Sequence, residues 1–184
     1  MTRILIADDH GVMRKGLRLQ LEQHTGLEVV GEACDGREAV RLAEELRPDL
    51  AIMDIGMPNL NGIDATAQIV KRNPDIGVII LSVYSDEEYL LRALTAGAKG
   101  YLLKESADVD LLRAVHAVAQ RKSFFSPTIA QMLLDDFVLT AGELAPIEGM
   151  DHCDLHRRTT LDSGSRYPGH QTAPSHRITA EATY

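Results

Sequence analysis

The feature that most restricts the fold of this chain is a regular alternation between short apolar runs and longer amphipathic segments. Five runs, rich in aliphatic side chains, have the length of buried strands. They are Arg3–Ala7, Leu27–Gly31, Leu50–Met53, Val78–Leu81 and Gly100–Leu103. The first, third and fourth are apolar almost throughout, which is typical of parallel strands that are covered on both faces.

Segments with helical periodicity follow each of these runs. We expect a helix carrying Val12, Leu17, Leu19 and Leu21, one from Arg37 to Leu46, one from Gly62 to before Asn73-Pro74, one after Ser85-Asp86, and one from about Ala107 to Gln120. Ser85 is the expected N-cap of the fourth helix, and Gly97 its end. Strands that alternate with helices predict an α/β fold, namely a doubly wound five-stranded parallel sheet with helices on both faces.

Composition excludes several other classes of protein. With 184 residues, the chain has room for one domain and an appendage, and its net charge of −8 argues against a nucleic-acid coat protein. Cys34 and Cys153 lie too far apart in sequence to indicate a disulfide framework. The N-terminus is not a secretory signal, and no apolar stretch approaches the roughly 20 residues of a membrane helix. We therefore expect a cytoplasmic protein without a membrane partner.

Polar residues stand where four of the expected strands end. They are Asp8 and Asp9, Asp54, Ser82 and Lys104. In open parallel sheets, the site lies at the carboxyl ends of the strands, near the switch in strand order. Each residue alone has an ordinary explanation as a turn former, a helix cap or a solvated charge. Their coincidence at one sheet edge favours a functional site.

The residue types at this edge indicate phosphoryl-transfer chemistry. Two carboxylates about 4 Å apart repel by roughly 4 kcal/mol at an effective dielectric near 20, so the cluster needs a cation. Oxygen ligands without a histidine cluster favour Mg²⁺, held by Asp8 and Asp9. Lys104 adds a fixed positive charge, and Ser82 adds a hydroxyl. Asp54, which stands alone at the end of the central strand, is the expected nucleophile.

Residues 3 to about 121 closely resemble the receiver domain of response regulators in two-component systems, in the subgroup with a LuxR-type DNA-binding domain. The motifs that carry the resemblance are Ile6-Ala7-Asp8-Asp9-His10, Met53-Asp54-Ile55-Gly56-Met57-Pro58 with Gly62, Leu81-Ser82, and Gly97-Ala98-Lys99-Gly100-Tyr101-Leu102-Leu103-Lys104. The resemblance implies a flavodoxin-like fold and a conformational switch. It also implies phosphorylation by a histidine kinase, and homodimerisation as a readout.

The resemblance also implies a role for each matching residue. Asp54 is the implied phosphoacceptor, and Asp9 binds Mg²⁺ directly while Asp8 binds it mainly through water. The backbone carbonyl of Gly56 is a further metal ligand. The residues that would contact or report the phosphoryl group are Lys104, Ser82 and the switch aromatic Tyr101. Many receivers have Lys-Pro with a cis peptide where this chain has Lys104-Glu105, which leaves the conformation of that loop open.

The predicted domain organisation is a receiver domain at residues 1–122, a linker helix at 123–138 and a tail at 139–184. Residues 123–127 are expected to form a loop that leads into the linker helix, with Ser126 as N-cap and Pro127 in the first turn. Ile129, Met132, Leu133, Leu134 and Phe137 form its apolar face. This face is expected to pack on the receiver or on a dimer partner.

The tail does not match a complete output domain. Residues 139–144 resemble the opening of a LuxR-type helix-turn-helix domain with Gly142 in place of the usual Arg, but no recognition helix follows. Aliphatic residues are sparse, so we expect a mostly disordered tail. Our hypothesis is that the DNA-binding domain was lost by truncation and frame change. Two alternatives stay open: an atypical C-terminus that still binds DNA, and a stand-alone receiver that acts through protein contacts.

Other functions fit the sequence less well. His152, Cys153, His156, His170 and His176 match no established zinc spacing, and Arg157-Arg158 is too little for nucleic acid. A dinucleotide enzyme needs a Gly-rich turn where the chain has Asp8-Asp9-His10-Gly11. A dehalogenase-type phosphatase would have a second acid at His10. We therefore expect a self-phosphorylating and autodephosphorylating switch and not a metabolic enzyme.

Overall fold

Six parallel strands form a single sheet in the computed structural model, which describes residues 1–134. The strands are β1 (Thr2–Ala7), β2 (Leu27–Ala33), β3 (Leu50–Asp54), β4 (Gly77–Ser82), β5 (Gly100–Leu103) and β6 (Phe124–Phe125). Their order is β2-β1-β3-β4-β5-β6, and every neighbouring pair is parallel. This order reverses between β1 and β3, so the predicted doubly wound, flavodoxin-like fold is confirmed.

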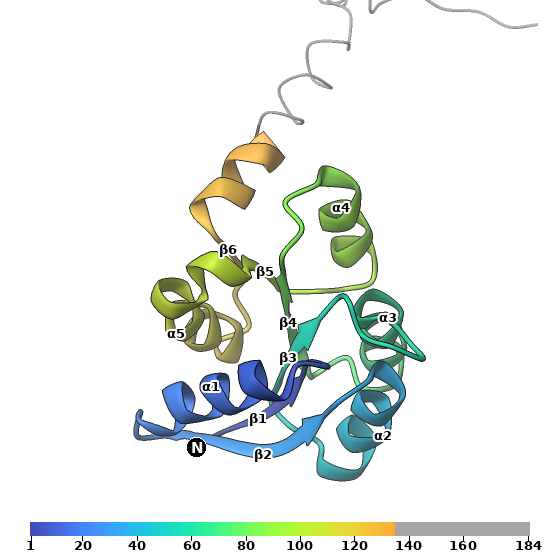
Figure 1. Ribbon diagram of the computed structural model, residues 1–184, viewed down its shortest axis with the longest axis vertical. Coiled ribbons are helices and arrows are strands. Elements are labelled where there is room, and N and C mark those ends of the chain that lie inside the picture. Colours follow the sequence, from blue (N-terminus) through green and yellow to red (C-terminus); the bar gives the residue numbers. More distant parts are fainter. Residues whose placement is uncertain (135–184) are drawn as a thin grey trace, which may run out of the picture. The chain divides into compact units, whose positions relative to one another are not determined.

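Helices cover both faces of the sheet, as the alternating pattern predicts. They are α1 (Gly11–Glu22), α2 (Gly36–Leu46), α3 (Gly62–Arg72), α4 (Glu87–Thr95) and α5 (Ala107–Ala119), with a 3₁₀ turn at Lys104–Ser106. Figure 1 shows α1 and α5 on one side of the sheet and α2 and α3 on the other. The peptide bond after Lys104 is trans, like every other peptide bond among the described residues, which answers the question that the sequence left open.

The sheet divides the core into two apolar layers. Along β3, Leu50 and Ile52 belong to the layer beneath α1 and α5, whereas Ala51 and Met53 belong to the layer beneath α2 and α3. All four side chains are buried, because successive residues of a strand point to opposite faces and both faces are covered. The central strand therefore presents no polar group until Asp54, its last residue.

Helix ends lie close to the positions that the sequence predicts, with one correction. The Asp35 and Asn61 side chains accept hydrogen bonds at the starts of α2 and α3. Ser85 was expected to cap α4, but the N-cap is Asp86, one residue later. Both residue types suit the position, so local sequence does not distinguish them. Gly97 follows α4 with φ +99°, a conformation that favours glycine.

The Phe124–Phe125 segment was predicted as loop, and this prediction is wrong. It forms β6 beside β5, where the Phe124 N–H donates to the Lys99 carbonyl (3.0 Å) and the Ser126 N–H donates to the Tyr101 carbonyl (3.2 Å). A two-residue strand shows no alternation, so only its distant partner identifies it. The result is that the edge of β5, next to Tyr101, is covered by the chain itself.

The first part of the predicted linker helix follows β6. Residues 127–134 are helical, and the Ala130 N–H donates to the Ser126 carbonyl (2.9 Å). Ser126 thus starts the helix, although its buried hydroxyl has no hydrogen-bond partner among the described residues, so the expected side-chain cap is not made. Ile129 is fully buried and packs into the same apolar layer as Leu90 and Tyr101. This part of the helix therefore packs on the receiver.

Truncating Ile129 should weaken the fold. Ile129→Ala is expected to lower the free energy of unfolding by about 2–4 kcal/mol, because it opens a cavity in a packed layer. Urea unfolding followed by circular dichroism measures this change. Leu134→Ala is the matched control on the same helix, since Leu134 is 59% exposed, and it should change the value by less than about 0.5 kcal/mol. Equal effects of the two substitutions would contradict the packing of this helix.

Several predictions fall on residues 135–184, outside the described residues. They concern the end of the linker helix at 138, the tail at 139–184, its relation to a helix-turn-helix domain, and the zinc alternative at His152, Cys153, His156, His170 and His176. The domain boundaries at 122 and 138 likewise stay predictions. Within residues 1–134, none of the helices has both the length and the hydropathy that a membrane span requires.

Candidate functional site

An acidic pocket lies at the carboxyl edge of the sheet, where four strands end. Asp8 follows β1, Asp54 ends β3, Ser82 ends β4 and Lys104 follows β5. The parallel register aligns these ends: Ala7 pairs with Met53, Asp54 with Leu81, and Ser82 with Leu103. Topology alone thus brings to one edge side chains that are far apart in the sequence.

Lys104 connects the two buried carboxylates of this pocket. Its Nζ lies 2.8 Å from Asp8 Oδ2 and 3.0 Å from Asp54 Oδ2. The side chains of Asp8, Asp54 and Lys104 are 1%, 6% and 11% exposed. Two carboxylates therefore share one ammonium group in a largely desolvated place.

Burial perturbs the ionisation of the acid and the base of this pocket. Desolvation raises the pKa of the Asp54 carboxyl, and the hydrogen bond from Lys104 offsets this only in part. Desolvation also disfavours the Lys104 ammonium, but its hydrogen bonds to Asp8 and Asp54 outweigh that effect and raise the pKa of Lys104. Lys104 is thus a permanent cation at neutral pH, while the ionised form of Asp54 is destabilised by its surroundings.

Asp9 and His10 complete the rim of the pocket. The Asp9 side chain is 31% exposed, and its Oδ1 lies 2.6 Å from His10 Nδ1. The backbone N–H of His10 donates to Asp8 Oδ1 (2.7 Å), and Arg14 donates to the Asp8 carbonyl (2.6 Å). One ligand atom from each of Asp8, Asp9, His10 and Asp54 lies within 4.8 Å of the other three. This donor set fits a divalent cation, because carboxylate oxygens from two strand ends converge on one point.

His10 was not among the site residues predicted from the sequence. The predicted metal ligands were oxygen atoms only, whereas the structure places an imidazole nitrogen beside two of the carboxylates. The sequence feature that could have indicated His10 is its position directly after Asp8-Asp9, at the end of a strand. Local sequence does not show whether a side chain at that position turns toward the pocket or toward solvent.

Two glycines lie close to Asp54, and at one of them, Gly62, the close approach requires glycine. A Cβ added at Gly62 would lie 1.9 Å from the Asp54 carbonyl oxygen, so no other residue fits there without moving the strand end. A Cβ at Gly56 would lie 3.9 Å from Asp54 Oδ2, which places the Gly56 backbone beside the carboxylate. Packing against the Asp54 backbone therefore explains why a glycine stands at position 62.

Ser82 and Tyr101 meet at the backbone of Tyr84. Ser82 Oγ accepts a hydrogen bond from the Tyr84 N–H (2.9 Å), and the Tyr101 hydroxyl donates to the Tyr84 carbonyl (2.9 Å). Both side chains are fully buried, and burial raises the pKa of Tyr101. The Tyr84 ring stacks on Tyr89 of α4 at 4.6 Å. In this structure, the Ser82 hydroxyl is engaged by the β4–α4 loop and not by Asp54.

Comparison with known proteins shows which family this part of the chain matches. The model of the response regulator receiver domain matches residues 4–116, more than half of the chain. The transcriptional regulatory protein DegU of Brevibacillus brevis is 40% identical over 135 residues, which are 73% of this chain and 57% of DegU. The chain thus spans little more than half the length of that relative.

Solved structures give the same result. A LuxR-family two-component response regulator from Aurantimonas sp. SI85-9A1 is 36% identical with a TM-score of 0.72, covering 75% of this chain and 99% of that one. A structure of two RcsB dimers bound to two parallel DNAs is 29% identical with a TM-score of 0.67, covering 72% of this chain and 68% of that one.

Proposed function

This chain belongs to the response regulator receiver domain family of two-component systems, and we propose from this premise that Asp54 accepts a phosphoryl group with Mg²⁺ as cofactor. Phosphorylation of an aspartate is the standard mechanism of this domain. The observation that carries the assignment to Asp54 is the contact of Lys104 Nζ with Asp54 Oδ2 and Asp8 Oδ2 in a buried pocket.

The proposed reaction uses an oxygen of Asp54 as the nucleophile. An Asp54 Oδ atom forms a bond to phosphorus while the P–N bond of a phosphohistidine on the kinase breaks, and the imidazole nitrogen keeps the electron pair. Lys104, whose pKa is raised, stays protonated and offsets charge on the phosphoryl oxygens. Hydrolysis of the acyl phosphate returns the carboxylate. The chain is thus proposed to act as a self-phosphorylating switch.

The metal ligands are proposed from the donor set. Asp9 and Asp54 would bind Mg²⁺ through carboxylate oxygens, Asp8 would bind it mainly through water, and the Gly56 carbonyl would complete the protein ligands. When bound, Mg²⁺ supplies charge neutralisation at the phosphoryl oxygens. Lys104 contacts both Asp8 and Asp54 and so helps to position these two carboxylates.

The switch is proposed to start at Ser82. A phosphoryl group on Asp54 adds strong acceptor oxygens at the same sheet edge. The Ser82 hydroxyl, whose oxygen now accepts from the Tyr84 N–H, would then donate to the phosphoryl group and release the β4–α4 loop. Because Tyr101 also holds that loop through the Tyr84 carbonyl, the release reaches β5 and α4.

Removing the Ser82 hydroxyl should separate phosphorylation from switching. Ser82→Ala is expected to keep phosphoryl uptake within about threefold of wild type, because the nucleophile and Lys104 are unchanged. The change in hydrogen exchange of residues 83–95 upon phosphorylation should disappear. Ser85→Ala, three residues along in the exposed part of the same loop, is the control and should retain that change. If Ser82→Ala shows the full change in hydrogen exchange, the switch does not act through the Ser82 hydroxyl.

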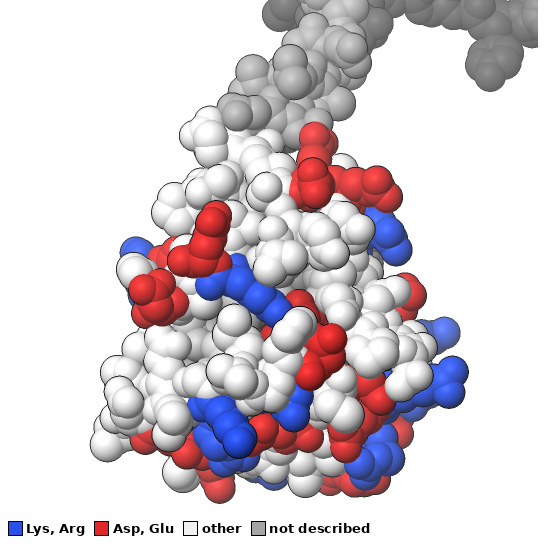
Figure 2. Space-filling view, in the orientation of Figure 1, with Lys and Arg blue, Asp and Glu red and all other residues white. Residues whose placement is uncertain are grey.

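The output is proposed to be regulation of transcription, through a histidine kinase upstream and homodimerisation downstream, in the cytoplasm. The support is that the DegU relative is named as a transcriptional regulatory protein and that one similar structure holds RcsB dimers bound to DNA. On the face shown in Figure 2, acidic and basic side chains are interspersed over the described residues, without a continuous basic patch. A stand-alone receiver that acts through protein contacts, or DNA binding by residues after 138, are the alternatives.

Phosphoryl uptake tests the proposed function directly. The full chain, incubated with phosphoramidate and MgCl₂, should gain the mass of one phosphoryl group, and EDTA should prevent the gain. Borohydride reduction followed by peptide mapping should place the acyl phosphate at residue 54. No gain in a folded sample with Mg²⁺, or a label at another residue, would overturn the proposal.

A further inference from the structure

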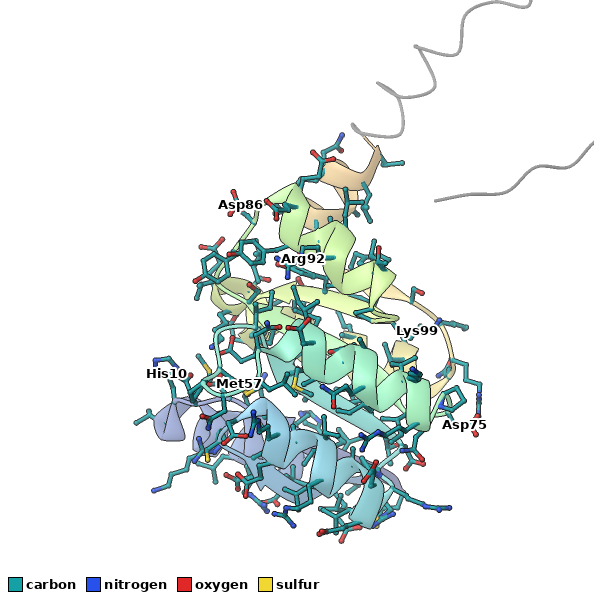
Figure 3. All side chains as sticks on the ribbon, turned by 90° about the vertical axis from the view of Figure 1, so that its right-hand side faces the viewer. His10, Met57, Asp75, Asp86, Arg92 and Lys99 are labelled. Atoms are coloured by element: carbon teal, nitrogen blue, oxygen red, sulfur yellow. The ribbon has the colours of Figure 1, made fainter. Side chains whose placement is uncertain are left out.

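His10 lies at the acidic pocket, but the proposed reaction does not use it. Its Nδ1 is 2.6 Å from Asp9 Oδ1 and 3.3 Å from Asp8 Oδ1. Figure 3 shows His10 at the same end of the sheet as Met57 of the β3–α3 loop, and Asp75 and Lys99 at the opposite end. The His10 ring is 71% exposed, so it is not there to fill space in the core.

Lys104 and His10 approach different oxygens of Asp8. Lys104 Nζ contacts Oδ2, whereas the backbone N–H and the ring Nδ1 of His10 lie at Oδ1. Lys104 also contacts Asp54, and His10 also contacts Asp9. The imidazole therefore sits on the side of the pocket formed by Asp8 and Asp9, the two expected metal holders. It does not compete with Lys104 for the same atoms.

Distances permit the imidazole to share an ion with the carboxylates. The four candidate ligand atoms lie within 4.8 Å of one another. Ligands on opposite sides of an ion with bonds of about 2.1 Å are about 4.2 Å apart, and adjacent ligands are about 3.0 Å apart. Atoms at the 4.8 Å limit would therefore close by about 0.6 Å, while His10 Nδ1 and Asp9 Oδ1, now 2.6 Å apart, would separate slightly. An exposed ring can make this movement by a small rotation. A neutral imidazole that binds an ion through Nδ1 carries its proton on Nε2.

We infer that His10 Nδ1 is a metal ligand that lets this pocket take a late first-row divalent ion, such as Co²⁺, Ni²⁺ or Zn²⁺, as well as Mg²⁺. The inference rests on the proposed function, because it uses the same carboxylates. Mg²⁺ is bound by oxygen ligands and gains little from imidazole, whereas the later ions bind imidazole well. His10 thus determines which ions the pocket accepts, while Asp9 and Asp54 determine whether it accepts any.

Calorimetric titration of the full chain with MgCl₂ and with CoCl₂ tests this role. His10→Gln should weaken Co²⁺ binding at this site by about tenfold or more and leave Mg²⁺ affinity within about twofold, because only the later ion loses a ligand. His24→Gln is the matched control, an exposed histidine in the α1–β2 turn, and should change neither affinity. The chain has seven histidines, so only Co²⁺ binding that Asp9→Asn removes is counted as binding in the pocket.

A spectroscopic readout separates a ligand from a residue that only orients Asp9. In Co²⁺-loaded protein, a coordinated imidazole gives proton NMR signals with large paramagnetic contact shifts. One such set should vanish in His10→Gln and remain in His24→Gln. Loss of Mg²⁺ and Co²⁺ affinity by equal factors in His10→Gln, or no lost signal, would overturn the inference and leave the proposed function standing. If Asp9→Asn keeps full affinity for both ions, the metal site of the proposed function fails as well.

Discussion

Asp54→Asn is expected to reduce phosphoryl uptake from phosphoramidate by at least about a thousandfold, because an amide in place of the carboxylate removes the nucleophile. Intact-mass measurement over a time course with MgCl₂ gives the rate. The pocket itself should persist, since asparagine has nearly the same volume and Lys104 still contacts Asp8. The effect is therefore on chemistry and not on folding.

The stability of the same variant provides an independent check of folding. Because burial raises the pKa of Asp54 above 3.8, the folded state binds this proton more tightly than the unfolded state. Wild-type stability without metal therefore falls as pH rises through the range between 3.8 and the raised pKa. Asp54→Asn does not lose stability in this way. Its free energy of unfolding in urea with EDTA, relative to that of wild type, should therefore increase over that pH range and stay higher at neutral pH.

A control for the phosphorylation test lies at the other end of the sheet. Asp75 is 82% exposed and stands at the opposite end from His10 in Figure 3, so Asp75→Asn should be phosphorylated at the wild-type rate. Labelling of Asp54→Asn at the wild-type rate would show that another residue accepts the phosphoryl group. Loss of labelling in both variants would point to a general effect of removing an acidic side chain.

Lys104→Met is expected to lower the free energy of unfolding by about 3–5 kcal/mol at pH 7 without metal, because it leaves Asp8 and Asp54 buried without their shared cation. The raised pKa of Lys104 keeps its ammonium group charged throughout the range from pH 5 to 8, so Lys104 itself does not titrate there. In the variant, the carboxylates bind protons more readily. The deficit should therefore shrink as pH falls toward 5.

Three further measurements test whether the effect of Lys104→Met comes from the ion pairs in the pocket. Lys99→Met changes an exposed lysine at the opposite end of the sheet and should cost less than about 0.5 kcal/mol. Adding Asp54→Asn to Lys104→Met should recover a large part of the loss, since one of the two repelling charges is gone. Mg²⁺ should stabilise Lys104→Met more than wild type. A Lys104→Met protein as stable as Lys99→Met would mean that the ion pairs in the pocket contribute nothing.

The sequence predicted the five main strands, the helices between them and the edge where the polar residues gather. The clearest example is β3, where four consecutive apolar residues indicate a buried strand and the polar Asp54 indicates where it ends. Asp8 and Lys104 follow from the same logic, since polar residues directly after buried strands of a parallel sheet share one edge. These features depend on local periodicity, which a single sequence records.

Other features depend on partners that are distant in sequence. β6 exists because the edge of β5 offers free backbone groups to Phe124 and Ser126. The engagement of Ser82 and Tyr101 with Tyr84 requires the β4–α4 loop to lie over the end of β5. His10 joins the pocket because its ring turns toward Asp9. None of these follows from the residue types alone.

The order of apolar and polar residues by itself determined the fold class, the site edge and the types of side chain at that edge, because burial of apolar faces at fixed periods leaves few arrangements. Tertiary packing alone decided which oxygen of Asp8 faces Lys104 and which faces His10, and that Ile129 of the linker helix joins the core. The physical reason is that hydrogen bonds and close packing act over a few ångströms. These short-range interactions select among side-chain positions that are equally compatible with the pattern of hydrophobicity.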